Sequence, residues 1–102
     1  MESFENIAES IFNAATQQYE KLFEAIDYEP GIDYFGMMVT ETKSNANACE
    51  NIINYVKASV SESYADIFDV SVERKECSDK EFPDDIANIE IYLSWKKVYT
   101  VE

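Results

Sequence analysis

The stretch FDVSVERKECSDKEFPDDIANIEIYLSWK, residues 68–96, decides the predicted fold because apolar residues recur at every second position near both of its ends. Over residues 68–73, and again over residues 89–96, apolar side chains alternate with more polar ones. Strict alternation is typical of a half-buried strand, since successive side chains point to opposite faces of a sheet. We therefore predict two strands that pair as an antiparallel hairpin and are joined by the acidic segment 78–85.

Two helices and a further strand are predicted upstream of this hairpin. Apolar residues recur at three- and four-residue steps over residues 3–27 and over residues 44–64, which places them on one face of each helix. Ser3 suits the first position before the first helix, where a side-chain oxygen can accept a backbone hydrogen bond. Residues 33–41, DYFGMMVTE, are apolar on both faces, which is typical of a strand covered on both sides or lying against a partner.

The order helix, strand, helix, strand, strand predicts a single α+β domain over residues 1–102. We expect two helices packed on one face of a small mixed β-sheet that ends in a C-terminal antiparallel hairpin. The middle strand–helix–strand unit predicts a crossover whose two strands run parallel. The last strand is then expected to lie between them.

The chain is strongly acidic, with 21 Asp and Glu residues against eight Lys and Arg residues and a net charge of −13. Such a charge disfavours direct binding to nucleic acid or to an anionic membrane, because nucleic-acid affinity depends on Lys and Arg neutralising phosphates. A basic protein is the natural electrostatic complement. An acidic composition that serves only solubility is the alternative interpretation.

The sequence lacks the residues on which most catalytic and metal sites depend. It contains no histidine, the commonest general base and metal ligand, and only two cysteines, Cys49 and Cys77. Cys49 lies on the apolar face of the second predicted helix, which indicates a small buried side chain. Two glycines, Gly31 and Gly36, cannot form a phosphate-binding loop. We expect no catalytic residues, no metal ligands and no cofactor, so the protein is predicted not to be an enzyme.

The N-terminus, MESFENIAES, has neither the basic nor the apolar region of a secretory signal, and no apolar run approaches the ~20 residues of a membrane span. A cytoplasmic location with reduced thiols is therefore the expectation.

The segment SDKEFPDD, residues 78–85, places four carboxylates around Phe82. A calcium loop would need oxygen ligands at alternate positions and a glycine at its turn, whereas this segment has Pro83 and no glycine. We predict a hairpin connection rather than a cation site. Away from it, Tyr28, Tyr55 and Tyr92 fall outside the apolar stripes, and exposed tyrosines beside carboxylates are typical of protein-binding surfaces.

In size, charge and lack of recognisable chemistry, the chain resembles small acidic inhibitors such as toxin-immunity, anti-restriction and anti-CRISPR proteins. The resemblance implies a non-enzymatic binding protein that inhibits a basic, nucleic-acid-handling partner, such as a nuclease or toxin, by occupying its cationic surface. Mimicry of nucleic acid would need acids from several elements, because carboxylates one helical turn apart are ~6 Å apart whereas duplex DNA carries one charge per ~1.7 Å.

The alternative is a structural or accessory subunit that forms a homodimer through the apolar strand 34–39, the last strand or a helix face. A small enzyme that uses carboxylates is a third possibility. For the leading hypothesis, the candidate partner-binding residues are acidic or aromatic: Glu5, Glu9, Glu20, Glu24, Asp79, Glu81, Phe82, Asp84, Asp85 and Tyr92.

Overall fold

The computed structural model describes residues 3–77, 81 and 83–96, and these form two helical segments and one sheet. In chain order the elements are α1 (Phe4–Thr16), the 3₁₀ helix η1 (Gln17–Leu22), β1 (Asp27–Pro30), β2 (Tyr34–Thr42), α2 (Ala46–Ser59), the π-helical turn η2 (Val60–Tyr64), β3 (Phe68–Glu76) and β4 (Asp85–Trp95). Ser3 precedes α1, and its Oγ accepts a hydrogen bond from the Asn6 backbone N–H at 3.2 Å, as predicted.

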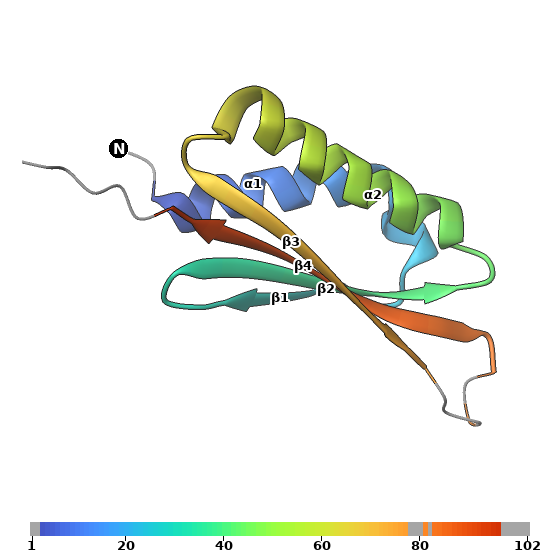
Figure 1. The fold of residues 1–102 in the computed structure, drawn as a ribbon. Helices are drawn as coiled ribbons and strands as arrows, with labels where there is room; N and C mark the ends of the chain where they lie inside the picture. Colours follow the sequence, from blue (N-terminus) through green and yellow to red (C-terminus); the bar gives the residue numbers. More distant parts are fainter. Residues whose placement is uncertain (1–2, 78–80, 82, 97–102) are drawn as a thin grey trace, which may run out of the picture.

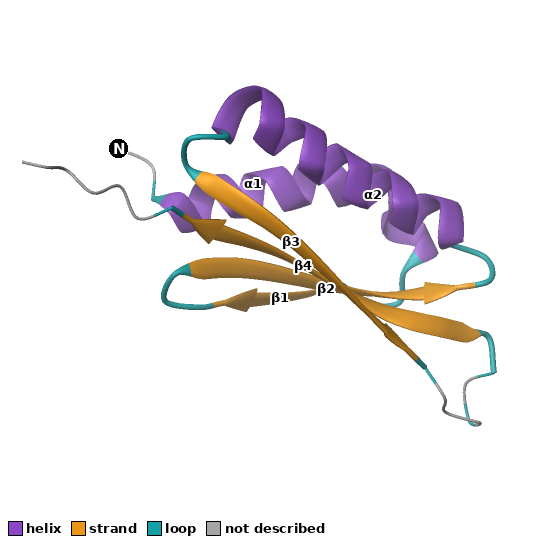
Figure 2. Cartoon of the chain, viewed as in Figure 1, coloured by secondary structure: helices purple, strands orange, loops and turns teal. Residues whose placement is uncertain are grey.

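The strands form one sheet in the order β1-β2-β4-β3, and every neighbouring pair is antiparallel. Helices α1 and α2 lie side by side on one face of this sheet, and no described element covers the other face (Figures 1 and 2). The predicted α+β architecture is thus confirmed, including the C-terminal hairpin of β3 and β4. Strands β2 and β3 run parallel, as expected, and β4 lies between them, so no parallel pair is hydrogen-bonded.

The core lies between the sheet and the helices, and it is built from alternate strand residues. The strands supply Phe35, Met37, Val39, Phe68, Ile89, Ile91 and Leu93, and the helical segments supply Ala8, Ile11, Phe12, Ala15, Cys49, Ile52, Val56 and Val60. Burying one such large aliphatic or aromatic side chain contributes about 1.5–3 kcal/mol to folding. The strand residues that recur every two positions and the helix residues that recur about every 3.6 positions therefore pack together in one core layer.

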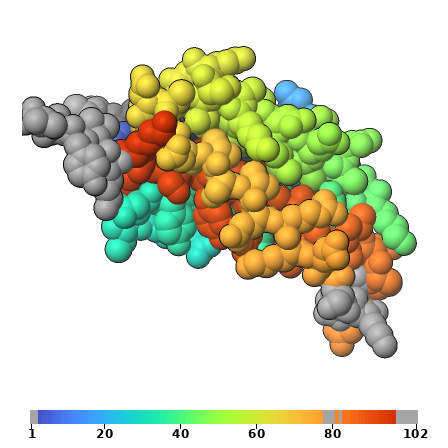
Figure 3. All heavy atoms as spheres, in the orientation of Figure 1, coloured from blue at the N-terminus to red at the C-terminus, as the bar shows by residue number. Residues whose placement is uncertain are grey.

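Strand β3 lies at one edge of the sheet. In the space-filling view, β3 runs along the surface as the yellow and orange band (Figure 3). Strand β3 is an edge strand, as is β1, whereas β2 and β4 are interior. The two strands that the homodimer hypothesis would use therefore each have hydrogen-bonded neighbours on both sides.

The prediction of one long helix over residues 3–27 is wrong beyond Thr16. The α-helix ends there, the 3₁₀ helix η1 follows, and residues 27–30 form the edge strand β1. Pairing with β2 places Tyr28 on the helix-facing side, where its ring stacks with Phe12 and Phe35 at centroid distances of 6.3 and 5.9 Å. This aromatic packing and the backbone pairing with β2 compensate for ending the helix early.

Asn45 is a buried polar residue that joins three parts of the chain. Its Oδ1 accepts a hydrogen bond from the Thr42 backbone N–H at 2.7 Å, and its Nδ2 donates to the carbonyls of Thr40 at 3.0 Å and Leu22 at 3.4 Å. The side-chain amide thus pairs with the edge of β2 beyond the end of β1, as a neighbouring strand would. It also anchors the end of η1 to that edge.

Replacing Asn45 with alanine should destabilise the protein by about 2 kcal/mol, because the part-buried backbone groups of Thr40, Thr42 and Leu22 would lose their hydrogen-bond partner. Urea unfolding monitored by circular dichroism measures this change. Asn47→Ala is the matched control, since Asn47 is exposed in the first turn of α2, and it should change the stability by less than about 0.5 kcal/mol. Equal effects of the two substitutions would contradict the role assigned to Asn45.

Candidate acidic docking site

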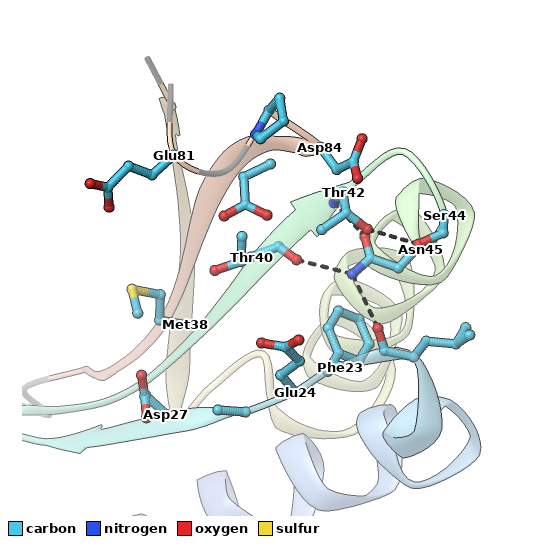
Figure 4. A pocket seen from close by; sticks show the side chains of 14 residues that line it. Phe23, Glu24, Asp27, Met38, Thr40, Thr42, Ser44, Asn45, Glu81 and Asp84 are labelled. Carbon is cyan, nitrogen blue, oxygen red and sulfur yellow. Dashed lines mark hydrogen bonds between the residues drawn. The ribbon is translucent and has the colours of Figure 1, made fainter. Parts of the chain in front are cut away.

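An open hollow of about 680 Å³ lies beside the C-terminal half of β2. We call it the acidic hollow, and its carboxylates are Glu24, Asp27, Glu81, Asp84 and Asp85. In Figure 4, Glu24 and Asp27 lie on one side of the hollow and Glu81 and Asp84 on the other, with Met38 and Thr40 between them. Acids far apart in the sequence therefore face one space.

The hollow follows from the way in which the chain enters β1. Strand β1 pairs with β2 only as far as Asp27 opposite Met38, and residues 23–26 lead away from the sheet toward η1. The amide of Asn45 pairs with the edge of β2 that this departure leaves open. Residues 83–85, which lead into β4, close the opposite side of the hollow.

Four of the predicted contact residues, Glu24, Glu81, Asp84 and Asp85, meet at the acidic hollow. The others do not join them: Glu5 and Glu9 are exposed on α1, Glu20 is exposed on η1, and Tyr92 lies on the uncovered sheet face. Asp79 and Phe82 lie outside the described residues. Glu20 and Glu24 belong to later parts of the chain than α1, so they do not extend the exposed acidic face of that helix.

Asp27 is a site residue that the sequence interpretation missed, because the helical spacing was extended through residue 27. It lines both the acidic hollow and a smaller hollow on the uncovered sheet face. A signal was present in the sequence: Asp27, Tyr28 and Glu29 alternate polar, aromatic and polar just before Pro30-Gly31, which is compatible with a short edge strand followed by a turn.

Within the described parts of the chain, no three Asp, Glu or Cys side chains come close enough together to hold a metal. Cys49 is buried, as predicted, and burial followed by the charge of Glu41 raises the pKa of its thiol to about 11, against a smaller opposing effect of Arg74. The Cys49 thiol is therefore poorly suited to act as a nucleophile.

Tyr92 is the aromatic residue at the centre of the uncovered sheet face. Its ring lies over Gly36, where an added Cβ would come within 2.8 Å of ring carbons, and it meets the Tyr34 ring edge-on at 5.6 Å. Burial, a hydrogen bond to Glu90 and the neighbouring negative charges raise the pKa of Tyr92 to about 12. The ring is thus held in place within a negatively charged environment.

Spectrophotometric titration of the tyrosines should show an ionisation step near pH 12 that is missing in Tyr92→Phe. Because the pKa of Tyr92 is raised on folding from its usual value of 10.0, the folded state favours the neutral phenol. That stabilisation is fully present below about pH 10 and is lost as the pH rises through 12. Between these values the free energy of unfolding should fall more steeply in the wild type than in Tyr92→Phe. Identical pH profiles would contradict this environment for Tyr92.

Comparisons with known proteins do not assign the chain to a family. No protein-family model matches it, and no curated protein matches it in sequence. Among solved structures it is similar to the crystal structure of an oxygen-binding H-NOX domain related to soluble guanylate cyclases, in the oxygen complex, with a TM-score of 0.49 and 13% identity. The match covers 95% of this chain and 51% of that one, so this chain spans about half the length of its structural neighbour. A likeness of this degree assigns neither a function nor a ligand to the chain.

None of the helices in the described residues has the length and apolar character needed to cross a membrane.

Proposed function

We propose that the protein is a non-enzymatic acidic inhibitor that binds a basic, nucleic-acid-handling protein and occupies its cationic surface. The observation that carries the proposal is the acidic hollow, where carboxylates from the connection into β1 and from the β3–β4 connection face one open space. A surface of this kind is complementary to the Lys and Arg residues that normally bind phosphates. The proposal covers inhibitors of the immunity, anti-restriction and anti-CRISPR type, and it places the protein in the cytoplasm with Cys49 and Cys77 as free thiols.

The strength of such binding would come from several charges acting together. A single exposed ion pair contributes only about 0–1 kcal/mol, whereas close charge pairs that lose water at an interface can couple by about 1.5–7 kcal/mol. The net charge of −13 would also steer a basic partner toward the protein and accelerate association at low salt. The inhibitor should therefore bind rapidly and in a strongly salt-dependent way.

The arrangement of the acids supports charge complementarity more than imitation of a duplex. Glu5 and Glu9 lie one turn apart on α1, and that helix ends at Thr16. Two charges ~6 Å apart do not reproduce the ~1.7 Å charge spacing of duplex DNA. The acidic hollow instead gathers carboxylates around a concave surface that a protruding cationic segment could enter.

The homodimer hypothesis has less support from the geometry. Both strands that it would use, β2 and β4, are interior strands of the sheet, and the helix-facing side chains of β2 are already buried in the core. Light scattering separates the two proposals, since a dimeric scaffold must self-associate and an inhibitor of this kind need not.

Neutralising the acidic hollow with Glu24→Gln, Asp84→Asn and Asp85→Asn should reduce affinity for a basic nuclease partner at least about tenfold at low salt. The partner would be selected from a panel of basic nucleases and toxins by inhibition of its activity. Calorimetry at increasing ionic strength measures the affinity and its salt dependence.

The matched control is Glu5→Gln, Glu9→Gln and Glu20→Gln, which removes the same charge from exposed positions outside the hollow. It should lower the affinity much less than the first variant does. Affinity that stays constant from low to high salt, or equal losses in the two variants, would contradict the proposed function.

A further inference from the structure

We infer that the uncovered face of the sheet contains a slot for an arginine side chain of the basic partner. The slot is a second hollow, of about 250 Å³, which is lined by Asp27, Glu29, Met37, Met38, Glu90 and Tyr92 and adjoins the acidic hollow at Asp27 and Met38. The inference rests on the proposed function for the basic character of the partner. It adds which face docks and which side chain is recognised.

Strand register explains how these residues come together. Asp27, Met38, Glu90 and Glu73 stand opposite one another across β1, β2, β4 and β3, and Glu29, Gly36, Tyr92 and Ser71 form the neighbouring row. Residues in such rows, two positions apart along each strand, point to the same face of the sheet. Since Met37, Ile91 and Val72 point toward the helices, both rows lie on the uncovered face.

The slot matches both parts of an arginine side chain. The thioether of Met38 and the ring of Tyr92 offer apolar and aromatic surface to the stem and to the flat guanidinium. The carboxylates of Asp27, Glu29 and Glu90 surround them and can accept several N–H hydrogen bonds. Lysine offers a compact ammonium without a planar face, so it fits the fixed ring of Tyr92 less well.

The aromatic wall of the slot is formed before any partner binds. Gly36 leaves the space that the Tyr92 ring fills, and the Tyr34 ring supports it at an interplanar angle of 83°. A side chain that is already immobilised loses little conformational entropy on binding, which is typical of aromatic anchors at protein interfaces.

Some of the charges on this face lower the stability of the free protein. Glu73 and Glu90 stand directly opposite each other on β3 and β4, and such like-charged pairs destabilise a sheet. The ammonium of Lys75 lies 3.4 Å from Glu90, so the chain itself already places one cation on the β3 side of this face. On the β1 side, Asp27 and Glu29 form no ion pair within the described residues. An arginine from a partner would supply the missing positive charge there.

The experiment uses two synthetic peptides of equal length, one rich in arginine and one rich in lysine, titrated into the intact protein by calorimetry at low salt. The wild type should bind the arginine peptide several-fold more tightly than the lysine peptide. Tyr92→Leu should weaken arginine binding roughly tenfold, whereas Tyr92→Phe should retain most of it because the aromatic face remains. Circular dichroism establishes that each variant is folded.

Glu73→Gln provides a readout that does not depend on removing the ring. It should raise the denaturation midpoint of the free protein, because the repulsion with Glu90 disappears, and should leave arginine binding within a few-fold of the wild type, since Glu73 does not line the slot. Glu29→Gln should weaken arginine binding, because Glu29 lines it.

The outcomes separate this inference from the proposed function. If the wild type binds neither peptide nor any basic protein, the proposed function fails. If it binds both peptides equally, or if Tyr92→Leu binds as tightly as the wild type while the neutralised acidic hollow does not, the arginine slot is wrong and the acidic inhibitor stands.

Discussion

Successive side chains of a strand point to opposite faces of the sheet, and this constraint divides the interior strands into an apolar side and a polar side. In β2, Phe35, Met37 and Val39 pack against the helices, and Met38 and Thr40 are left on the other face. In β4, the odd-numbered residues Ile89, Ile91 and Leu93 also pack against the helices, and Glu90 and Tyr92 lie on the other face. Two helices on one side suffice to bury the core, so the side chains of the second face lie outside it.

The second face carries several carboxylates that do not stabilise the fold. The Glu73–Glu90 pair and the carboxylates around Tyr92 contribute nothing to the core, and repulsion among them opposes folding. Under the proposed function this arrangement is retained because relieving the repulsion would raise stability but remove the negative charge that a basic partner would recognise. Together with the acidic hollow, they direct much of the chain's excess negative charge toward one connected surface.

The fold was largely predictable because its decisive signals are local periods. Alternation over residues 68–73 and 89–96 located the hairpin, and helical spacing located the layer that covers it. Strand β1 was missed because Asp, Glu and Pro are poor strand formers, and its formation depends on pairing with β2 and on stacking of Tyr28. The proximity of Glu24 to Asp84 and Asp85 could not be predicted from the sequence either. It depends on where the chain leaves the edge of the sheet, and the spacing of acids along the sequence does not show this.

Met37 and Met38 offer the most direct test of the claim that the uncovered face is the docking face. They are adjacent in the sequence, but Met37 is buried at 1% exposure beneath the helices whereas Met38 lines both hollows. In protein labelled with ¹³C at the methionine methyl groups, addition of a basic partner or an arginine-rich peptide should shift the Met38 resonance and leave that of Met37 nearly unchanged. Binding that leaves the Met38 methyl resonance in place would show that another surface is used and would contradict this account.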